Sequence, residues 1–213
     1  MQSKSCIVSV AFREMYTRHS TNQEAWIKEH HPELSCIYFR DVLPYKHGIH
    51  QDDIVTKFQQ SLYGFKPHAI KQAVNAGYTK IVWLDPSVMP VDSLDILFDE
   101  LESHPVIVRT GDQSLSSMVN KRALDWFGVG DISNINHVGG TIYGFNFDNI
   151  IAVNIFNKWL EAEEAGIFGT QDDFMMGHWA DEACMALALA KYNHEQYFPS
   201  FKYLNQKDLE KTI

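Results

Sequence analysis

The feature that most constrains this sequence is a short apolar run enclosed by two helical patterns, within residues 66–102. The run, Lys80 to Leu84 (KIVWL), is stopped by an Asp-Pro pair, and its length and composition predict a strand buried on both faces. The helical pattern before it begins near Pro67 and ends at Gly77. The pattern after it places apolar residues at i, i+3, i+4 and i+7, namely Leu94, Leu97, Phe98 and Leu101, with Asp92 as the expected cap. Such an alternation is typical of an α/β sheet.

The rest of the chain continues this alternation. Further strands are predicted at 5–12, 34–39, 106–108 and 141–145, and further helices at 22–30, 148–165 and 180–190. We therefore predict an α/β fold with a central, mostly parallel sheet flanked by helices. The length of 213 residues fits a single domain spanning 1–213, which is either a whole protein or one domain of a longer chain.

Composition excludes several classes of protein. The chain has 18 Lys and Arg against 27 Asp and Glu, a net charge of −9, and no basic run, so we expect no nucleic-acid partner. The longest early apolar stretch, Ile7 to Phe12, is far shorter than the roughly 20 residues of a membrane span and lacks the layout of a signal peptide, which predicts a cytoplasmic protein. The cysteines lack the spacing of a zinc site or a disulfide framework and are predicted to be buried thiols: Cys6, Cys36 and Cys184.

Asp85 is the first charged residue after the KIVWL strand. Ligands of open α/β sheets bind outside the carboxyl ends of the strands, which is where Asp85 is expected. Its carboxylate and the Ser87 hydroxyl, presented on one tight turn, could hold a divalent cation that grips a substrate diphosphate. The competing interpretation is a plain turn, because Asp, Pro and Ser are turn formers. Spacing alone favours the plain turn.

Three stretches together resemble nucleotide-sugar-dependent glycosyltransferases of the GT-A fold. FKPHAIKQAVNAGYTKIVWLDPSVMPVDSLDILFDEL (residues 65–101) is similar to the family's central segment, in which a Lys/Arg-Pro helix precedes an apolar strand ending in a DxD motif. HVGGTIYGFN (137–146) resembles the family's glycine-containing strand, and HWADEACMALAL (178–189) resembles its acidic helix start. Domains of large DNA viruses and of some bacteria are similar in this way. The resemblance implies one GT-A-like, that is Rossmann-like, domain.

The resemblance also implies a metal site with one departure from the family. The DxD motif reads here as Asp85, Pro86 and Ser87, so its second carboxylate is missing. Asp85 carries over as the residue that faces the metal and the sugar diphosphate, and Ser87 carries over by position, although a hydroxyl is a weaker ligand than a carboxylate. The implied cofactor is Mn²⁺ or Mg²⁺, with a dependence that is weak or completed by a distant ligand such as His194.

The end of the first strand and the start of the helix near residue 66 are implied to bind the nucleotide. Tyr16 could stack on a uracil ring, and Arg13 and Lys66 could contact phosphate. The competing interpretations are a polar surface loop for Arg13 and a solvated helix end for Lys66. The predicted nucleotide-sugar site comprises Val10, Ala11, Phe12, Arg13, Tyr16, Lys66, Leu84, Asp85, Pro86, Ser87, Gly139, Gly140, Asp181 and Glu182.

Acidic residues that open the predicted helix at 180–190 are the candidate catalytic groups. The resemblance makes Asp181 the first choice for a carboxylate beside the reacting sugar, together with Asp85, and the pair at 172–173 the second. For Glu182 the better interpretation is favourable interaction with the helix dipole. Gly139 and Gly140 would let a sugar approach the backbone closely, and the alternative for them is a β-bulge.

These observations predict a glycosyltransferase, either a hexosyl- or a pentosyltransferase. It would move a sugar from a nucleotide-diphosphate donor, expected to be a UDP-sugar, to a hydroxyl of a glycan or other acceptor. The first alternative is an inactive sugar-nucleotide-binding module, which the weakened DxD motif favours. The second is a nucleotidyl- or phosphotransferase on a similar fold, which is disfavoured because the sequence has no GxxxxGK loop.

Overall fold

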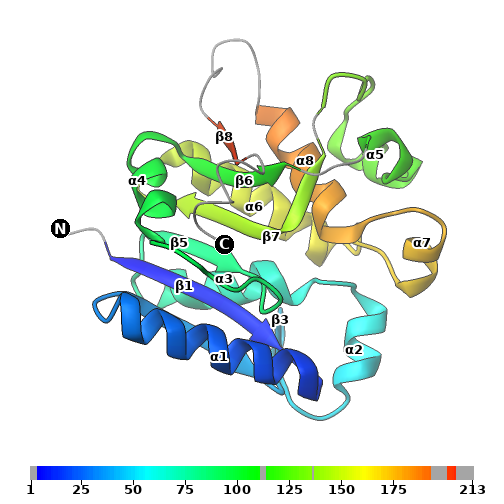
Figure 1. The fold of residues 1–213 in the computed structure, drawn as a ribbon. Coiled ribbons are helices and arrows are strands. Elements are labelled where there is room, and N and C mark those ends of the chain that lie inside the picture. The colour runs from blue at the N-terminus through cyan, green and yellow to red at the C-terminus, as the bar shows by residue number, and fades with distance from the viewer. Residues whose placement is uncertain (1–3, 111–113, 136, 193–200, 205–213) are drawn as a thin grey trace.

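The computed structural model describes residues 4–110, 114–135, 137–192 and 201–204 (Figure 1). Its main sheet has the strand order β2-β1-β5-β7-β6-β8. These strands are β1 (Ser5–Ala11), β2 (Ser35–Arg40), β5 (Lys80–Leu84), β6 (Val106–Thr110), β7 (Val138–Asn146) and β8 (Phe201–Leu204). β7 pairs antiparallel with both of its neighbours, and the other neighbouring pairs are parallel. The prediction of an α/β fold with a mostly parallel sheet is confirmed.

Helices cover both faces of the sheet, as Figure 1 shows. On one face α1 (Glu14–His30) and α4 (Asp95–Ser103) pack on strand residues that include Ile7, Val82 and Ile107. On the other face lie α3 (Phe65–Asn75), α6 (Ile150–Glu164) and α8 (Ala180–Tyr192), over a larger core. Every residue of β5 is buried, because this strand lies in the middle of the sheet with helices on both sides.

Shorter elements lie around the main layers. They are β3 (Leu43–Tyr45), β4 (Gly48–His50), α2 (Ile54–Gln60), the 3₁₀ turn η1 (Leu115–Ser117), α5 (Lys121–Phe127) and α7 (Gln171–Met175). In Figure 1, α2 and α7 stand at the same end of the molecule, beyond the end of β1. None of the helices in the described ranges combines the length and the apolar character that crossing a membrane requires.

Two local expectations from the sequence need correction. Asp92 does not cap α4, because the helix begins at Asp95 and the Asp92 carboxylate accepts a hydrogen bond from the Ser93 amide instead. The first helix is longer than predicted and begins at Glu14, directly after β1. Its face against the sheet carries the polar residues Ser20 and Gln23 beside Ile27, so hydrophobic spacing alone did not reveal its first half.

Candidate functional site

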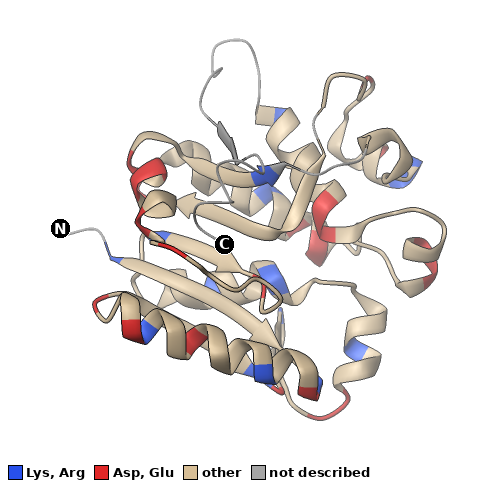
Figure 2. Cartoon of the chain, viewed as in Figure 1, with Lys and Arg blue, Asp and Glu red and all other residues tan. Residues whose placement is uncertain are grey.

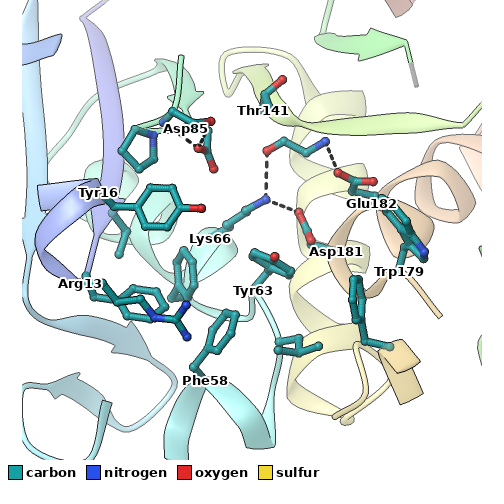
Figure 3. Close-up of a pocket in the computed structure, with 18 of the residues that line it drawn as sticks. Arg13, Tyr16, Phe58, Tyr63, Lys66, Asp85, Thr141, Trp179, Asp181 and Glu182 are labelled. Atoms are coloured by element: carbon teal, nitrogen blue, oxygen red, sulfur yellow. Dashed lines mark hydrogen bonds and ion pairs between the residues drawn. The ribbon is translucent and has the colours of Figure 1, made fainter. Parts of the chain in front are cut away.

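A cavity of about 430 Å³ opens where β1 and β5 end and β7 begins (Figure 3). This is the edge of the sheet at which open α/β folds bind their ligands. One part of the wall carries charged and polar groups, and the rest is mainly aromatic. The lining residues are Val10, Phe12, Arg13, Tyr16, Phe58, Leu62, Tyr63, Phe65, Lys66, Asp85, Pro86, Ser87, Gly140, Thr141, Gln171, Phe174, Trp179, Asp181 and Glu182.

Asp85 stands on a tight turn at the cavity wall. Its amide donates to the Thr141 carbonyl at 2.9 Å, and its carbonyl accepts from the Val88 amide at 2.9 Å. The Asp85 Oδ1 atom accepts from both the amide (2.9 Å) and the hydroxyl (2.6 Å) of Ser87. Asp85 is half-buried and lines the cavity rather than pointing into closed packing. The plain-turn geometry and a ligand-facing carboxylate are therefore both present.

Lys66 and Asp181 form a buried ion pair at the centre of the cavity (Figure 3). The Lys66 Nζ atom lies 2.6 Å from Asp181 Oδ2 and donates to the Gly140 carbonyl at 3.0 Å. Tyr143 donates its hydroxyl to the same Asp181 oxygen at 2.8 Å. The side chains of the pair are only 4% and 2% exposed, which excludes the solvated helix-end interpretation of Lys66.

Burial and charge act in opposite directions on this pair. Burial disfavours the charged ammonium, but the carboxylates of Asp181 and Asp85 outweigh it and raise the pKa of Lys66. Burial raises the pKa of Asp181 to about 6, against the opposing effect of Lys66. Burial also raises the pKa of Tyr143, so its hydroxyl keeps its proton and donates. The cavity thus holds a lysine that favours its charged form beside a carboxyl group whose pKa is raised by burial.

Glu182 and Gly140 form the next part of the wall. The Gly140 amide donates to Glu182 Oε1 at 2.7 Å, and the His137 ring lies 3.0 Å from Glu182 Oε2. A Cβ atom at position 140 would come within 2.7 Å of Glu182 Oε1 and 2.8 Å of Lys66 Nζ. A side chain at this position would therefore require the charged ends of Glu182 and Lys66 to shift. Figure 2 shows the acidic start of α8 across from a basic position at the start of α3.

The other end of the cavity is aromatic. The ring of Phe12 packs against Phe58 and Phe65, with centroids 5.1 and 5.8 Å apart. Arg13 holds a backbone φ of 74°, and its guanidinium lies 5.6 Å from the centroid of the Phe12 ring. Figure 3 shows Tyr16 and Arg13 on the side of the cavity away from Asp181, so a flat ring could be bound there apart from the ion pair.

Most of the predicted site residues line this one cavity. They are Val10, Phe12, Arg13, Tyr16, Lys66, Asp85, Pro86, Ser87, Gly140, Asp181 and Glu182. Ala11, Leu84 and Gly139 do not line it, because strand residues alternate between the two faces of the sheet. Leu84 joins the core on the face of α1 and α4, and Gly139 faces Arg109. His194 lies outside the described residues.

The second-choice acidic pair has a structural role at one of its positions. Asp173 forms a reciprocal capping box with Thr170 at the start of α7, and neither Asp172 nor Asp173 lines the cavity. Several residues that were not predicted do line it, among them Tyr63, Phe174 and Trp179. Aromatic residues in a sequence are ordinarily expected to belong to the hydrophobic core. The one sequence signal for an aromatic cavity wall was the presence of three aromatic rings within residues 58–65.

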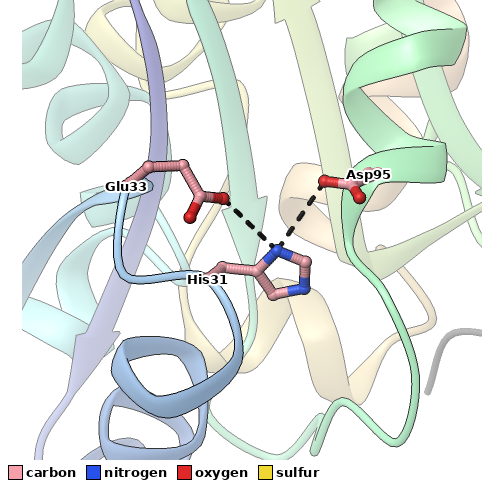
Figure 4. Close-up of side chains that lie close together, drawn as sticks. All are labelled: His31, Glu33 and Asp95. Carbon is pink, nitrogen blue, oxygen red and sulfur yellow. Dashed lines mark ion pairs between the residues drawn. The ribbon is translucent and has the colours of Figure 1, made fainter.

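Figure 4 shows a second group of side chains, in which two carboxylates face a histidine ring. Within the described ranges, His31, Glu33 and Asp95 bring one ligand atom each within 4.8 Å of one another. However, the Leu94 amide donates to His31 Nε2 at 3.1 Å, so the ring proton resides on Nδ1, the atom that faces both carboxylates. A metal at Nδ1 would have to displace that proton. The cluster also lies where β2 begins, at the end of the sheet opposite the cavity.

Asp85 and Ser87 are the cavity residues that suit a divalent ion. Both hydrogen bonds from Ser87 go to Oδ1 of Asp85, so Oδ2 and the Ser87 hydroxyl oxygen offer two adjacent oxygen ligands. Mg²⁺ sites are commonly built from one or two carboxylates together with substrate phosphates. The residues therefore fit an ion that is held jointly by the protein and a bound diphosphate.

Comparison with known proteins gives structural relatives only. No protein-family model and no curated protein matches the chain. Its structure is similar to that of a glycosyltransferase involved in the glycosylation of the major capsid of PBCV-1, with a TM-score of 0.56, 11% identity, and coverage of 95% of this chain and 81% of that chain. Two further matches are weaker. Galactosyltransferase LgtC gives a TM-score of 0.46 at 13% identity and coverage of 95% and 74%, and mouse xyloside xylosyltransferase 1 gives 0.49 at 9% and coverage of 94% and 85%.

The similarity to the PBCV-1 enzyme extends over nearly the whole chain and shows the fold. The chain has the GT-A fold, as the sequence resemblance implied. At this level of identity the comparison assigns no donor and no acceptor.

Proposed function

We propose that this chain is a glycosyltransferase that moves a sugar from a UDP-linked donor to a hydroxyl of a glycan or other acceptor. One observation carries the proposal: in a GT-A fold, the cavity at the carboxyl ends of β1 and β5 contains a buried cation between two separate carboxylates. Glycosyl transfer releases a nucleoside diphosphate, whose growing negative charge needs a fixed cation nearby. Lys66 meets that need without the entropy cost of ordering an exposed lysine, because Asp181 and Gly140 already hold it.

The remaining groups divide between the two ends of the donor. Tyr16 and Phe12 would bind the base, with Arg13 near the phosphates. Asp85 and Ser87 would face the diphosphate. Asp181 would act beside the sugar, where it would balance Lys66 and accept a hydroxyl hydrogen bond.

The cofactor in this proposal is Mn²⁺ or Mg²⁺, held by Asp85 and Ser87 together with the donor. Such an ion would act as a Lewis acid on the departing diphosphate. Because the protein offers a single carboxylate on this turn, we expect a low affinity for the ion when no donor is bound.

Chelation and one substitution test the metal. We expect a chelator to reduce UDP release and Mn²⁺ or Mg²⁺ to restore it. Ser87→Asp would add the missing carboxylate and is expected to lower the Mn²⁺ concentration for half-maximal activity by on the order of tenfold. Activity titrations with Mn²⁺ measure both effects. Activity that chelation leaves unchanged, together with an unaltered Mn²⁺ requirement in the Ser87→Asp variant, would remove the metal from the proposal.

Titration of Asp181 predicts how activity depends on pH. Below about pH 6 its carboxyl is protonated while Lys66 keeps its charge, so the pair gains a positive charge and the carboxylate is lost. Transfer should therefore fall as the pH is lowered through about 6. Its folded-state pKa exceeds the ordinary 3.8, so the stability contributed by this group is fully present at lower pH and is lost as the pH rises through about 6. A profile of kcat against pH measures the effect on transfer. Denaturation of the wild type and of Asp181→Asn at several pH values measures the effect on stability. A flat kcat profile across pH 6 would contradict the first.

A screen of nucleotide sugars tests the proposed function itself. Ligand that binds only the native state raises the melting temperature, so UDP-sugars are expected to do so in the presence of Mn²⁺. UDP release with an acceptor mixture then measures turnover. Binding without any UDP release would support the inactive module, and release of pyrophosphate or transfer of phosphate would support the nucleotidyl- or phosphotransferase alternative.

A further inference from the structure

Helix α1 carries polar residues on the face that packs against the sheet. Ser20 and Gln23 are both fully buried beside Ile27. A buried amide destabilises a protein unless all of its polar atoms find partners, so a glutamine at this position needs a specific reason. The partners of Gln23 supply one, because they lie outside α1, in β2 and in the turn that follows β5.

The Gln23 side chain contacts both ends of the Asp85 turn. Its Nε2 atom donates to the Asp85 carbonyl at 3.0 Å and to the Val88 carbonyl at 2.5 Å. Its Oε1 atom accepts from the Tyr38 hydroxyl at 2.9 Å. Every hydrogen of the amide is thus used, and two of the three bonds hold the backbone of the turn.

The orientation of this amide follows from its partners. Two carbonyl oxygens face one end of the side chain, and a carbonyl accepts but does not donate, so that end must be the NH₂ group. The other end is therefore the oxygen, and Tyr38 must donate to it. The Arg40 guanidinium lies 4.6 Å from the centroid of the Tyr38 ring.

These contacts complete the fixing of Asp85 at the cavity wall. Its amide is bonded to Thr141, its carbonyl to Val88 and Gln23, and its Oδ1 atom to Ser87. We infer that Gln23, held by Tyr38, is a positioning residue that sets the direction of the Asp85 carboxylate toward a bound diphosphate. This inference rests on the proposed function, because it assumes that the diphosphate of a nucleotide lies against Asp85.

Gln23→Met is the most direct test. Methionine has a similar length but donates no hydrogen bond, so the turn would lose both bonds from α1. We expect the variant to bind UDP on the order of tenfold more weakly than the wild type in the presence of Mn²⁺. Calorimetry at a temperature well below the melting temperature of the variant measures this affinity. Tyr38→Phe should give a smaller loss, because it frees the Gln23 amide without removing it.

Ser20→Ala is the matched control. Ser20 is buried on the same face of α1, but its hydroxyl bonds to the Thr17 carbonyl and to Arg40, not to the turn. It should lower the melting temperature while leaving UDP affinity within about twofold.

A double-mutant cycle separates positioning from general destabilisation. If Gln23 acts through the Asp85 carboxylate, then Gln23→Met should add little further loss of UDP affinity to an Asp85→Asn protein. Additive losses, or UDP binding by Gln23→Met equal to that of the wild type, would overturn the inference and leave the proposed function standing. A wild-type protein that binds neither UDP nor any UDP-sugar would overturn the proposed function, and the inference with it.

Discussion

Asp85→Ala is expected to lower kcat for sugar transfer by on the order of 10²–10³-fold or more while the protein stays folded. The Asp85 carboxylate lies at the cavity wall, and its partners in the protein are the amide and hydroxyl of the neighbouring Ser87. Removing it leaves no buried charge without a partner, because Lys66 keeps its ion pair with Asp181. The backbone bonds of Asp85 to Thr141, Val88 and Gln23 involve no side-chain atom of Asp85 and should persist.

Asp92→Ala provides the control in the same loop. Asp92 is exposed, and its carboxylate contacts the adjacent Ser93 amide. The variant should keep wild-type kcat and, like Asp85→Ala, should lose less than about 1 kcal/mol of stability by urea denaturation. Full transfer activity in Asp85→Ala would place the reaction elsewhere in the molecule.

Five of the six strands of the main sheet could be recognised from short-range patterns in the sequence, namely β1, β2, β5, β6 and β7, whereas their order in the sheet could not. β5 was recognisable because five residues buried on both faces have no polar alternation, and its Asp-Pro stop marked the edge where the site lies. β7 was expected as a strand, but its direction could not be deduced, because antiparallel pairing with both β5 and β6 depends on contacts between distant segments.

The candidate site was predictable one residue at a time, but its pairings were not. Lys66 and Asp181 were each assigned to the site. They lie 115 positions apart in the sequence, and no local pattern indicates that their side chains meet at 2.6 Å. The assignment of Lys66 to a phosphate assumed a free ammonium, whereas the structure gives it a buried counter-ion. The contact of Gln23 with the Asp85 turn could not be predicted either, because a polar residue in a helix is ordinarily expected to face solvent.

The second large effect should come from breaking this buried pair. Lys66→Met would leave the Asp181 carboxylate buried without its cation, which typically costs about 3–5 kcal/mol. Urea denaturation near pH 7 measures this loss in the free energy of unfolding. Lys121→Met is the matched control, because Lys121 pairs with Asp125 on the surface, where the two side chains are 84% and 63% exposed, and such pairs contribute less than about 1 kcal/mol.

The double variant Lys66→Met with Asp181→Asn separates stability from catalysis. Asparagine carries no charge and still offers an oxygen to the Tyr143 hydroxyl, so most of the lost stability should return. Transfer should not return, because the double variant lacks both the cation proposed to lie near the diphosphate and the carboxylate proposed to lie near the sugar. A double variant that recovered activity along with stability would show that the pair only maintains the fold. Recovery of stability alone would show that the protein keeps two buried charges here for the reaction, since an uncharged pair of similar size maintains the fold equally well.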